Sequence, residues 1–288
     1  MKLEEIITNK IKEKDILRGI SEGERLDGRK PLEYRDIHIF PNLIERAEAS
    51  TLVSMGKTKV LVGVKLEIGE PFPDQPEKGV FMTNMELSPI ASPVFELGPP
   101  SDYAVELSRV IDRGIRESEM IDLNKLSIVP SEKVWLIFID IYPLDNDGNL
   151  IDASTIASVV SLYNTIMPKI EIEGTNVTVL EENAGPLPLD GLVTSVTFAQ
   201  KDDYRVVDPT YAEENIMDTR FTISFTGESE VCAIQKGKEG EVSPKKIKEF
   251  TEIGREKAEE LKNIISEPLS REPKEYKTVA EIFREMKG

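Results

Sequence analysis

The sequence has little of the chemistry on which many enzyme sites depend. Its 288 residues include one cysteine, one histidine and one tryptophan. A lone Cys232 excludes a disulfide framework, and Cys232 with His38 excludes a zinc site of several Cys and His ligands. A serine–histidine–acid triad would have to use His38, whose Arg-Asp-Ile-His-Ile setting favours an edge or surface strand. We therefore expect no metal site and no cofactor.

Long apolar segments are also missing from the sequence. No run is long enough to cross a membrane. Residues 1–19 are charged and amphipathic and do not have the apolar core of a signal peptide. We therefore expect an intracellular, cytoplasmic protein, in which the Asn176-Val177-Thr178 glycosylation sequon is coincidental.

Positive charge is scarce. The chain has 36 Lys and Arg residues against 53 Asp and Glu residues, which gives a net charge of −17. A surface of this charge repels nucleic acid as a whole. Binding of RNA or phosphate would therefore require a local cluster of arginines, or a partner that supplies positive charge.

The stretch from Val134 to Ile170 is the most informative that is present. Val134–Tyr142 is apolar on both faces, which predicts a central strand covered on both sides. A turn at Asp145–Gly148 follows, and then a helix that we expect to start after Asp152 and to stop at Pro168. This helix is apolar nearly all round, as a helix in the middle of a domain is. A strand, a loop and a helix N-terminus also form a common phosphate site.

The rest of the chain alternates strand and helix signals. Helices are expected over residues 3–20, after the N-cap Ser101 to about Ser118, and from Pro244 after the N-cap Ser243. Apolar alternation predicts strands over residues 35–40, 47–55, 59–68, 80–87, 176–181, 192–199, 205–209, 220–226 and 230–235.

The proline-rich segment Gly185–Pro188 is a candidate boundary between two similar α+β halves. The first half, residues 1–185, holds the N-terminal helix. The second half, residues 186–288, holds the C-terminal helix, and the charged tail after Pro268 is expected at the periphery.

The helix after Ser101 carries three arginines on one face. Arg109, Arg113 and Arg116 share this face because they are spaced by four and three residues. One interpretation is a solvated face with Glu106–Arg109 and Asp112–Arg116 ion pairs. The other is a binding site for a phosphate backbone. The opposite face, which should meet the core, has Ala104, Leu107, Ile111 and Ile115.

Several short motifs together resemble the RNase PH family from about residue 20 to residue 265. They are Arg25-Leu-Asp-Gly-Arg29, Tyr34-Arg35, Gly56-x-Thr58-x-Val60-x-Val62, Glu106–Arg113, Asp208-Pro-Thr, the hairpin at Arg220 and Ala233–Lys236. Within that family, three stretches resemble the non-catalytic subunit of the archaeal exosome ring: Trp135–Asp140, Asp147–Ala153 and Leu162–Asn164.

This resemblance implies an RNase PH-like fold, with two βαβα-type halves packed together and sheets covered by helices. It implies a hexameric ring made of three heterodimers with a catalytic RNase PH-like subunit, and cap subunits that bind RNA. Such a ring degrades single-stranded RNA from its 3′ end with phosphate. In the pattern of the non-catalytic subunit, Arg109 and Arg113 face the central channel and contact RNA, and Arg116 shares their helix face.

Three departures from the active family pattern predict that this chain does not catalyse the reaction. The loop Gly148–Asp152 lacks the phosphate-binding arginine, and Asp152 is expected to cap the helix N-terminus and repel phosphate. Asp102 and Tyr103 replace an arginine pair. The catalytic aspartate of active relatives falls on the hairpin strand near Arg220, where this sequence has none; Asp218 lies two residues away, so a small shift of the alignment could restore the carboxylate.

Two other functions compete with this interpretation. One is a phosphorolytic 3′–5′ exoribonuclease that is active alone, against which the loop Gly148–Asp152 argues. The other is a small-molecule kinase, which would need a glycine-rich phosphate loop. Gly56-Lys57-Thr58 resembles the end of such a loop, but Thr51 stands where the motif needs glycine.

Overall fold

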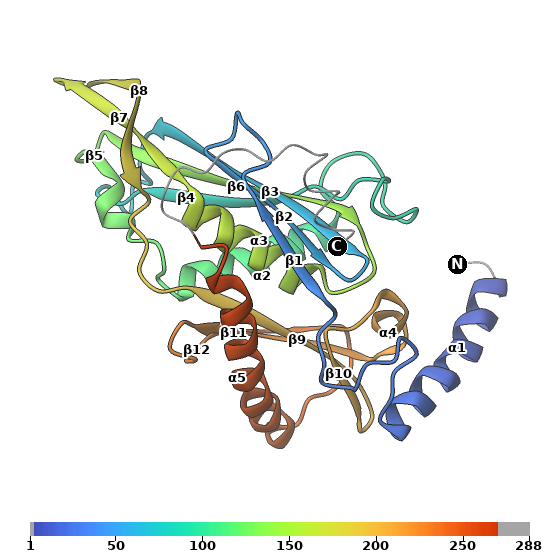
Figure 1. Cartoon of the computed structure of the whole chain (residues 1–288). Helices are drawn as coiled ribbons and strands as arrows, with labels where there is room; N and C mark the ends of the chain where they lie inside the picture. Colours follow the sequence, from blue (N-terminus) through green and yellow to red (C-terminus); the bar gives the residue numbers. More distant parts are fainter. Residues whose placement is uncertain (1–2, 270–288) are drawn as a thin grey trace.

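The computed structural model describes residues 3–269, and the side chains from residue 13 onward. Two β-sheets and the helices stack in layers (Figure 1). The α-helices within this range are α1 (Leu3–Glu22), α2 (Asp102–Glu117), α3 (Leu150–Asn164), α4 (Tyr211–Ile216) and α5 (Pro244–Ser266). The charged tail expected at the periphery lies almost entirely outside the described residues.

The first sheet has the order β1-β2-β3-β6-β4, with β5 beside β6. Only β4 runs parallel to its neighbour β6, because α2 forms the crossover between them; the other pairs are antiparallel. Its strands are β1 (Ile37–Pro41), β2 (Ala49–Met55), β3 (Thr58–Gly69), β4 (Val80–Met85), β5 (Ser127–Val129) and β6 (Lys133–Asp145).

The second sheet is antiparallel, with the order β10-β9-β11-β12. A separate two-stranded ribbon of β7 and β8 projects from the body of the molecule (Figure 1). The strands of these two groups are β7 (Ile166–Glu173), β8 (Asn176–Pro186), β9 (Val193–Lys201), β10 (Tyr204–Val207), β11 (Thr219–Thr226) and β12 (Val231–Gly237).

Helices α2 and α3 lie between the two sheets, and α5 covers the outer face of the second sheet (Figure 1). Helix α3 is buried on all sides because it packs on β2 and β3 above and on β9 below. The apolar run after Asp152, which has no charged residue up to the end of the helix, predicted this central place. Helix α5 buries a stripe of Phe250, Gly254, Ala258, Leu261 and Ile265. The α+β architecture expected from the sequence, with sheets covered by helices, is therefore present.

The prediction that the strand at Val134 is covered on both sides is wrong. On one face of β6, Trp135, Ile137, Ile139 and Ile141 are buried. The other face is half-buried, and Tyr142 on it is 41% exposed. The reason is that α2 and α3 lie on one side of this sheet only, as is common where most strands are antiparallel.

The predicted limits of the central helix are also wrong. Helix α3 begins at Leu150, before Asp152, and its N-cap is Asn149 in the left-handed conformation (φ 52°). Asn adopts this conformation more readily than most residues do. The helix ends at Asn164 because the next strand, β7, takes up Pro168. Within the described residues, no helix combines the length and the apolar character that crossing a membrane requires.

Candidate functional site

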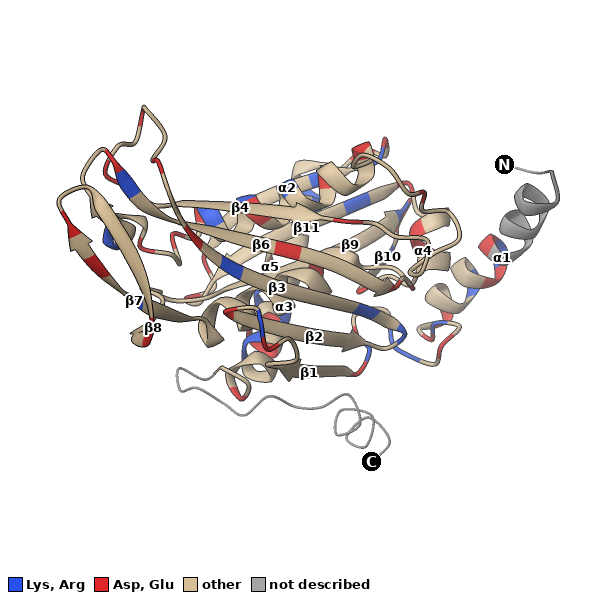
Figure 2. Ribbon diagram, turned by 90° about the horizontal axis from the view of Figure 1, so that it is seen from above, with Lys and Arg blue, Asp and Glu red and all other residues tan. Residues whose placement is uncertain are grey.

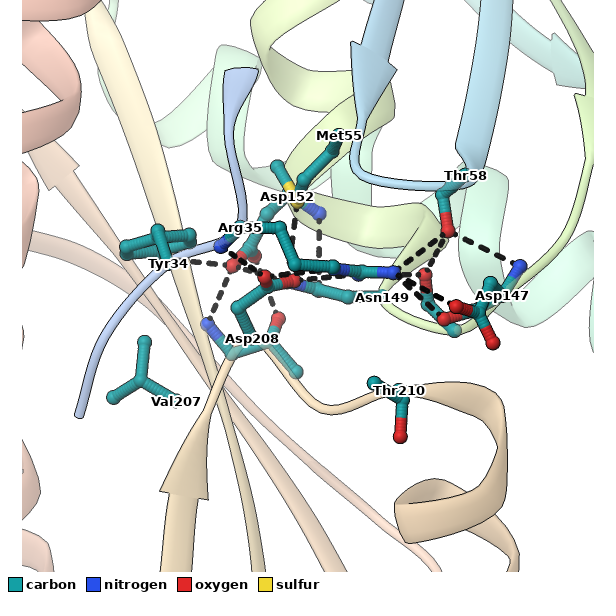
Figure 3. Close-up of polar contacts among 12 residues, drawn as sticks. Tyr34, Arg35, Met55, Thr58, Asp147, Asn149, Asp152, Val207, Asp208 and Thr210 are labelled. Carbon is teal, nitrogen blue, oxygen red and sulfur yellow. Dashed lines mark hydrogen bonds and ion pairs between the residues drawn. The ribbon is translucent and has the colours of Figure 1, made fainter. Parts of the chain in front are cut away.

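A buried network of charged side chains joins the N-terminal segment to the second sheet (Figure 3). The guanidinium of Arg35 contacts the Asp208 carboxylate at 2.6 and 2.9 Å. Arg29 adds a contact to the same carboxylate at 2.9 Å, and Arg25 donates to Glu213 at 2.8 Å. Removing one member of a buried ion pair costs about 3–5 kcal/mol. Arg35 also connects this network to the loop before α3, because its guanidinium donates to the Asp147 carbonyl at 2.8 Å.

Asp152 does not cap exposed N–H groups, contrary to the sequence prediction. Its carboxylate is fully buried and turns toward the second sheet, where it accepts from the Thr197 backbone (3.0 Å) and hydroxyl (2.7 Å). It also accepts from Tyr34 and from the Asn149 amide (Figure 3). Burial raises the pKa of Asp152 to about 7, although the hydrogen bonds from Asn149 and Thr197 oppose the shift. Asp152 thus links the layers of the molecule.

The N-terminus of α3 already has an anionic partner. The backbone N–H of Asn149 donates at 2.9 Å to the carboxylate of Glu214, which α4 supplies from the second half of the chain. Desolvation raises the pKa of Glu214, and the Asn149 N–H opposes this shift. The N–H groups of a helix N-terminus bind phosphate when they are free. Here an internal carboxylate occupies this position.

A cavity of about 1040 Å³ lies next to this loop, and of the three departures noted in the sequence only the arginine-pair position lines it, through Tyr103. Tyr103, Asn146, Glu214 and Arg220 all line it. Arg220 donates to Glu106 at 2.5 Å. Lys238 is the other cationic side chain among the described residues that line the cavity. It donates to the Met217 carbonyl at 2.9 Å and to the Glu214 carbonyl. Both cations are therefore engaged within the protein.

Asp218 does not restore a carboxylate to this cavity. It is not among the described residues that line it. Its side chain is half-exposed and lies 3.3 Å from Lys201 Nζ. Across the residues described by the structure, no three His, Cys, Asp or Glu side chains gather in a way that could hold a metal ion.

The three arginines of α2 are all exposed, as their spacing predicted, but their surroundings differ. Arg116 contacts the Asp112 carboxylate at 3.0 Å and stacks 4.1 Å from the Phe81 ring centre. The expected Asp112–Arg116 pair is therefore present. The expected Glu106–Arg109 pair is not, because Glu106 turns to Arg220.

Neither Arg109 nor Arg113 forms an ion pair with an acidic side chain among the described residues. Together with Arg116 they line a cleft of about 490 Å³ between α2 and the strands beside it. The remaining lining comes from Thr83 of β4, Gln235 of β12, and Glu106, Val110 and Asp112 of α2. Sequence reasoning assigned no role to Glu214 or Gln235, because both reach their sites from distant parts of the chain.

The two layered halves and their buried arginine–aspartate network define an RNase PH-like α+β protein. The chain belongs to the 3′ exoribonuclease family: the model of that family's domain 1 matches residues 33–168, and the model of its domain 2 matches residues 191–257.

Similar proteins are found among both curated sequences and solved structures. The chain is 46% identical to "Exosome complex component Rrp42" of Methanopyrus kandleri, over 90% of this chain and 97% of that protein. The protein of the same name from Thermococcus gammatolerans is also 46% identical, over 88% of this chain and 93% of its own. Among solved structures, a chain of the Archaeoglobus fulgidus exosome with RNA bound to the active site is 40% identical, with a TM-score of 0.81, over 90% of this chain and 100% of that one. A chain of an archaeal exosome core is 38% identical, with a TM-score of 0.79, over 91% of this chain and 99% of that one.

Proposed function

We propose that this chain is a non-catalytic subunit of an archaeal exosome. In this role it alternates with a catalytic RNase PH-like subunit in a hexameric ring of three heterodimers, carries RNA-binding cap subunits, and helps to hold single-stranded RNA during 3′–5′ phosphorolytic decay in the cytoplasm. Support comes from relatives that are named as exosome components and from solved exosome structures with the same fold.

One observation carries the RNA-binding part of the proposal. Arg109 and Arg113 are exposed on α2 with no acidic partner in the described part of the chain, although acidic residues outnumber basic ones. Two free guanidinium groups side by side offer paired donors that suit phosphate oxygens. In a chain with a net charge of −17, they form the local positive site that RNA binding requires.

Arg116 has a smaller part in the proposed site. It borders the same cleft, but its guanidinium is already bound to Asp112 and to the Phe81 carbonyl, which lies 3.3 Å away. A phosphate would have to compete with that carboxylate. We expect Arg116 to add positive charge at the edge of the RNA path and to hold α2 against β4.

The filled phosphate position supports the absence of catalysis. Phosphorolysis needs free donors that hold the attacking phosphate. Here the Asn149 N–H already donates to the Glu214 carboxylate, and the Arg220 guanidinium already donates to the Glu106 carboxylate. The alternative, an exoribonuclease active in its own right, is therefore not favoured.

A charge-reversal experiment tests the proposed RNA contact. Arg109→Glu with Arg113→Glu should leave the fold and ring assembly intact, because both side chains are exposed. RNA binding by the chain and RNA decay by the complex should both weaken. The slope of log affinity against log salt should fall by roughly 0.7 for each lost phosphate contact.

Lys248→Glu with Arg255→Glu is the matched control. These residues are exposed on α5, have no ion partner among the described residues, and change the net charge equally. If the α2 variant assembles and then binds and degrades RNA like the parent at every salt concentration, Arg109 and Arg113 are only a solvated helix face and the proposal fails.

A further inference from the structure

One uncharged polar side chain, Gln235, lines the arginine cleft from the strand β12. It lies opposite α2, where Arg109 and Arg113 line the same space. In the antiparallel ladder Gln235 pairs with Thr222, and two residues before it Ala233 pairs with Ser224. Because alternate residues of a strand share a face, Gln235 lies on the face of the second sheet that packs toward α2.

The amide of Gln235 is placed to bind something outside the protein. Its only hydrogen bond among the described residues is a long one, 3.4 Å, from Nε2 to the neighbouring Lys236 carbonyl. Its oxygen has no donor in this part of the chain. The side chain is half-buried, and a smaller pocket extends beneath it to Thr222 and Ser224. An amide has two N–H donors and one acceptor oxygen, so most of its capacity is free.

The charges around the amide favour a ligand with one anionic and one neutral polar group. Glu106 and Asp112 also line the cleft, but Arg220 and Arg116 already compensate them. Arg109 and Arg113 therefore leave the cleft with a net positive charge. The cleft volume of about 490 Å³ lies in the range of small-ligand sites. A single nucleotide, which has a phosphate and an uncharged sugar and base, fits this pattern.

We propose that the cleft seats one ribonucleotide of the bound strand, with its phosphate on Arg109 and Arg113 and its ribose 2′-hydroxyl on the amide of Gln235. The sugar is bonded directly to the phosphate, so it lies close to the arginines whatever the base is. A 2′-hydroxyl both donates and accepts, as an amide does, and it is the group that distinguishes RNA from DNA. Gln235 is then the residue through which this subunit prefers RNA. This inference rests on the proposed RNA contact of α2.

Binding of matched RNA and DNA strands tests this inference. Fluorescence anisotropy at low salt measures the affinity of the full chain for labelled oligoadenylate and for the deoxy strand of the same length. Gln235→Leu keeps a side chain of similar bulk but removes the amide. It should weaken RNA binding about three- to ten-fold, as expected for one hydrogen bond, and leave DNA binding unchanged. The same substitution at Gln75, which is exposed in a loop outside the cleft, is the control.

The outcomes separate this inference from the proposed function. Arg109→Glu with Arg113→Glu should weaken the binding of both strands, because both carry phosphates. If Gln235→Leu leaves the ratio of RNA to DNA affinity at the parent value, the ribose contact is wrong while the arginine contact stands. If the double arginine variant binds RNA as the parent does, or the parent binds neither strand, both proposals fall.

Discussion

Asp152 and Asp208 belong to one buried network, yet their pKa values move in opposite directions. Burial raises the pKa of Asp152 to about 7, since its neighbours are neutral donors. Burial would also raise the pKa of Asp208, but the hydrogen bonds and charge of Arg35, helped by Arg29, outweigh it and hold this pKa below the ordinary value. A charged partner thus decides which carboxylate stays ionised.

Asp152 should make the stability of the fold depend on pH near neutrality. The folded state holds its proton up to about pH 7, whereas the unfolded chain releases it near 3.8. This contribution is complete below the lower value and disappears as the pH rises through about 7. Asp208 has the opposite sign, because its contribution is present above its ordinary pKa and is lost in more acidic solution.

Melting temperatures measured between about pH 5 and about pH 8 check this prediction. The parent should lose stability across this window as Asp152 ionises. Asp152→Asn cannot titrate, so its melting temperature should fall less steeply, whatever its absolute value. Asp203→Asn, at a fully exposed side chain, is the control and should keep the parent slope. Equal slopes for parent and Asp152→Asn would contradict the assignment.

Gly148, in the loop before α3, stands at a position where the backbone conformation and the lack of space both require glycine. Its φ is +83°, and an added Cβ would lie 2.5 Å from the Pro209 carbonyl oxygen and from the Tyr211 nitrogen. Gly148→Ala should therefore lower the free energy of unfolding by more than the ~1–3 kcal/mol of backbone strain alone. Urea denaturation measures the loss.

Gly191→Ala supplies the comparison for Gly148. Gly191 also has positive φ, +70°, but nothing lies within 4 Å of the added Cβ. Its loss of stability therefore reports the backbone conformation without the contact. If the two variants lose equal stability, the close approach of the α3 loop to the residues before α4 does not constrain the fold.

At the scale of elements, the described side chains of α1, from residue 13 onward, meet the body through a small apolar cluster. Ile16 and Ile20 are buried in a small cluster with Ala199 and Val206 of the second sheet and Ile216 and Met217 near α4. This cluster is separate from the main core. A 2.9 Å ion pair between Glu13 and Lys201 is added at the edge. The helix should therefore be able to open without unfolding of the sheets.

Hydrogen exchange followed by mass spectrometry checks the independence of α1. Ile16→Ala with Ile20→Ala should speed exchange in α1 by about ten-fold or more, since each deletion costs about 2–5 kcal/mol of packing. Exchange in α3 and β9 should stay at the parent rate. Lys14→Ala, at an exposed position of the same helix, is the control. Equal acceleration in α3 would show that α1 is part of the main cooperative unit.

Elements with strong local signals were predictable from the sequence. The caps Ser101 and Ser243 accept hydrogen bonds from Ala104 and Lys246, as their residue types indicated. The apolar run after Asp152 predicted the central helix. Its start was misplaced, because the cap is Asn149 and not Asp152: the Asn149 side chain accepts from the Asp152 N–H and also donates to the distant Asp208 carboxylate.

The candidate site was predictable from the sequence only where its residues lie on a single helix. The spacing of the α2 arginines placed all three on one exposed face. The pairing of Glu106 with Arg220 and the reach of Glu214 to Asn149 join residues far apart in the sequence, so periodicity could not show them. Short elements such as β5 and α4 were also missed, since three and six residues carry too little pattern.

At the scale of the molecule, the filled phosphate position predicts an inert chain in isolation. Purified protein should release no nucleoside diphosphate from RNA with phosphate and magnesium present. The physical reason is that Glu214 and Glu106 engage the donors a phosphate would need. Thin-layer or ion-exchange analysis of the products measures this directly. Robust turnover by a contaminant-free preparation would contradict the non-catalytic assignment.

The exposed surface predicts a hetero-oligomer. The loop after β4 exposes Ile90, Val94 and Leu97 by 61–79%, and β4 and β12 each end a sheet with one unpaired edge. Apolar patches and free edges of this kind are usually covered by partners. Both signs of charge are spread over the elements (Figure 2), but Asp and Glu outnumber Lys and Arg. The net negative charge opposes self-association, so the chain should prefer a more basic subunit. Light scattering of the chain mixed with the catalytic subunit should show a particle several times heavier than either. Two monomer peaks at micromolar concentration would reject the ring.

The buried arginines also constrain how the chain folds as it is made. Arg25 and Arg35 bind partners 188 and 173 residues further along the chain. When the first sheet leaves the ribosome, these guanidinium groups have no carboxylates to meet, so the N-terminal segment must wait in water until residues 208–213 are made. Contacts of such long range form late. The first half is thus closed by the second, and a chain interrupted between them leaves its earliest residues undocked.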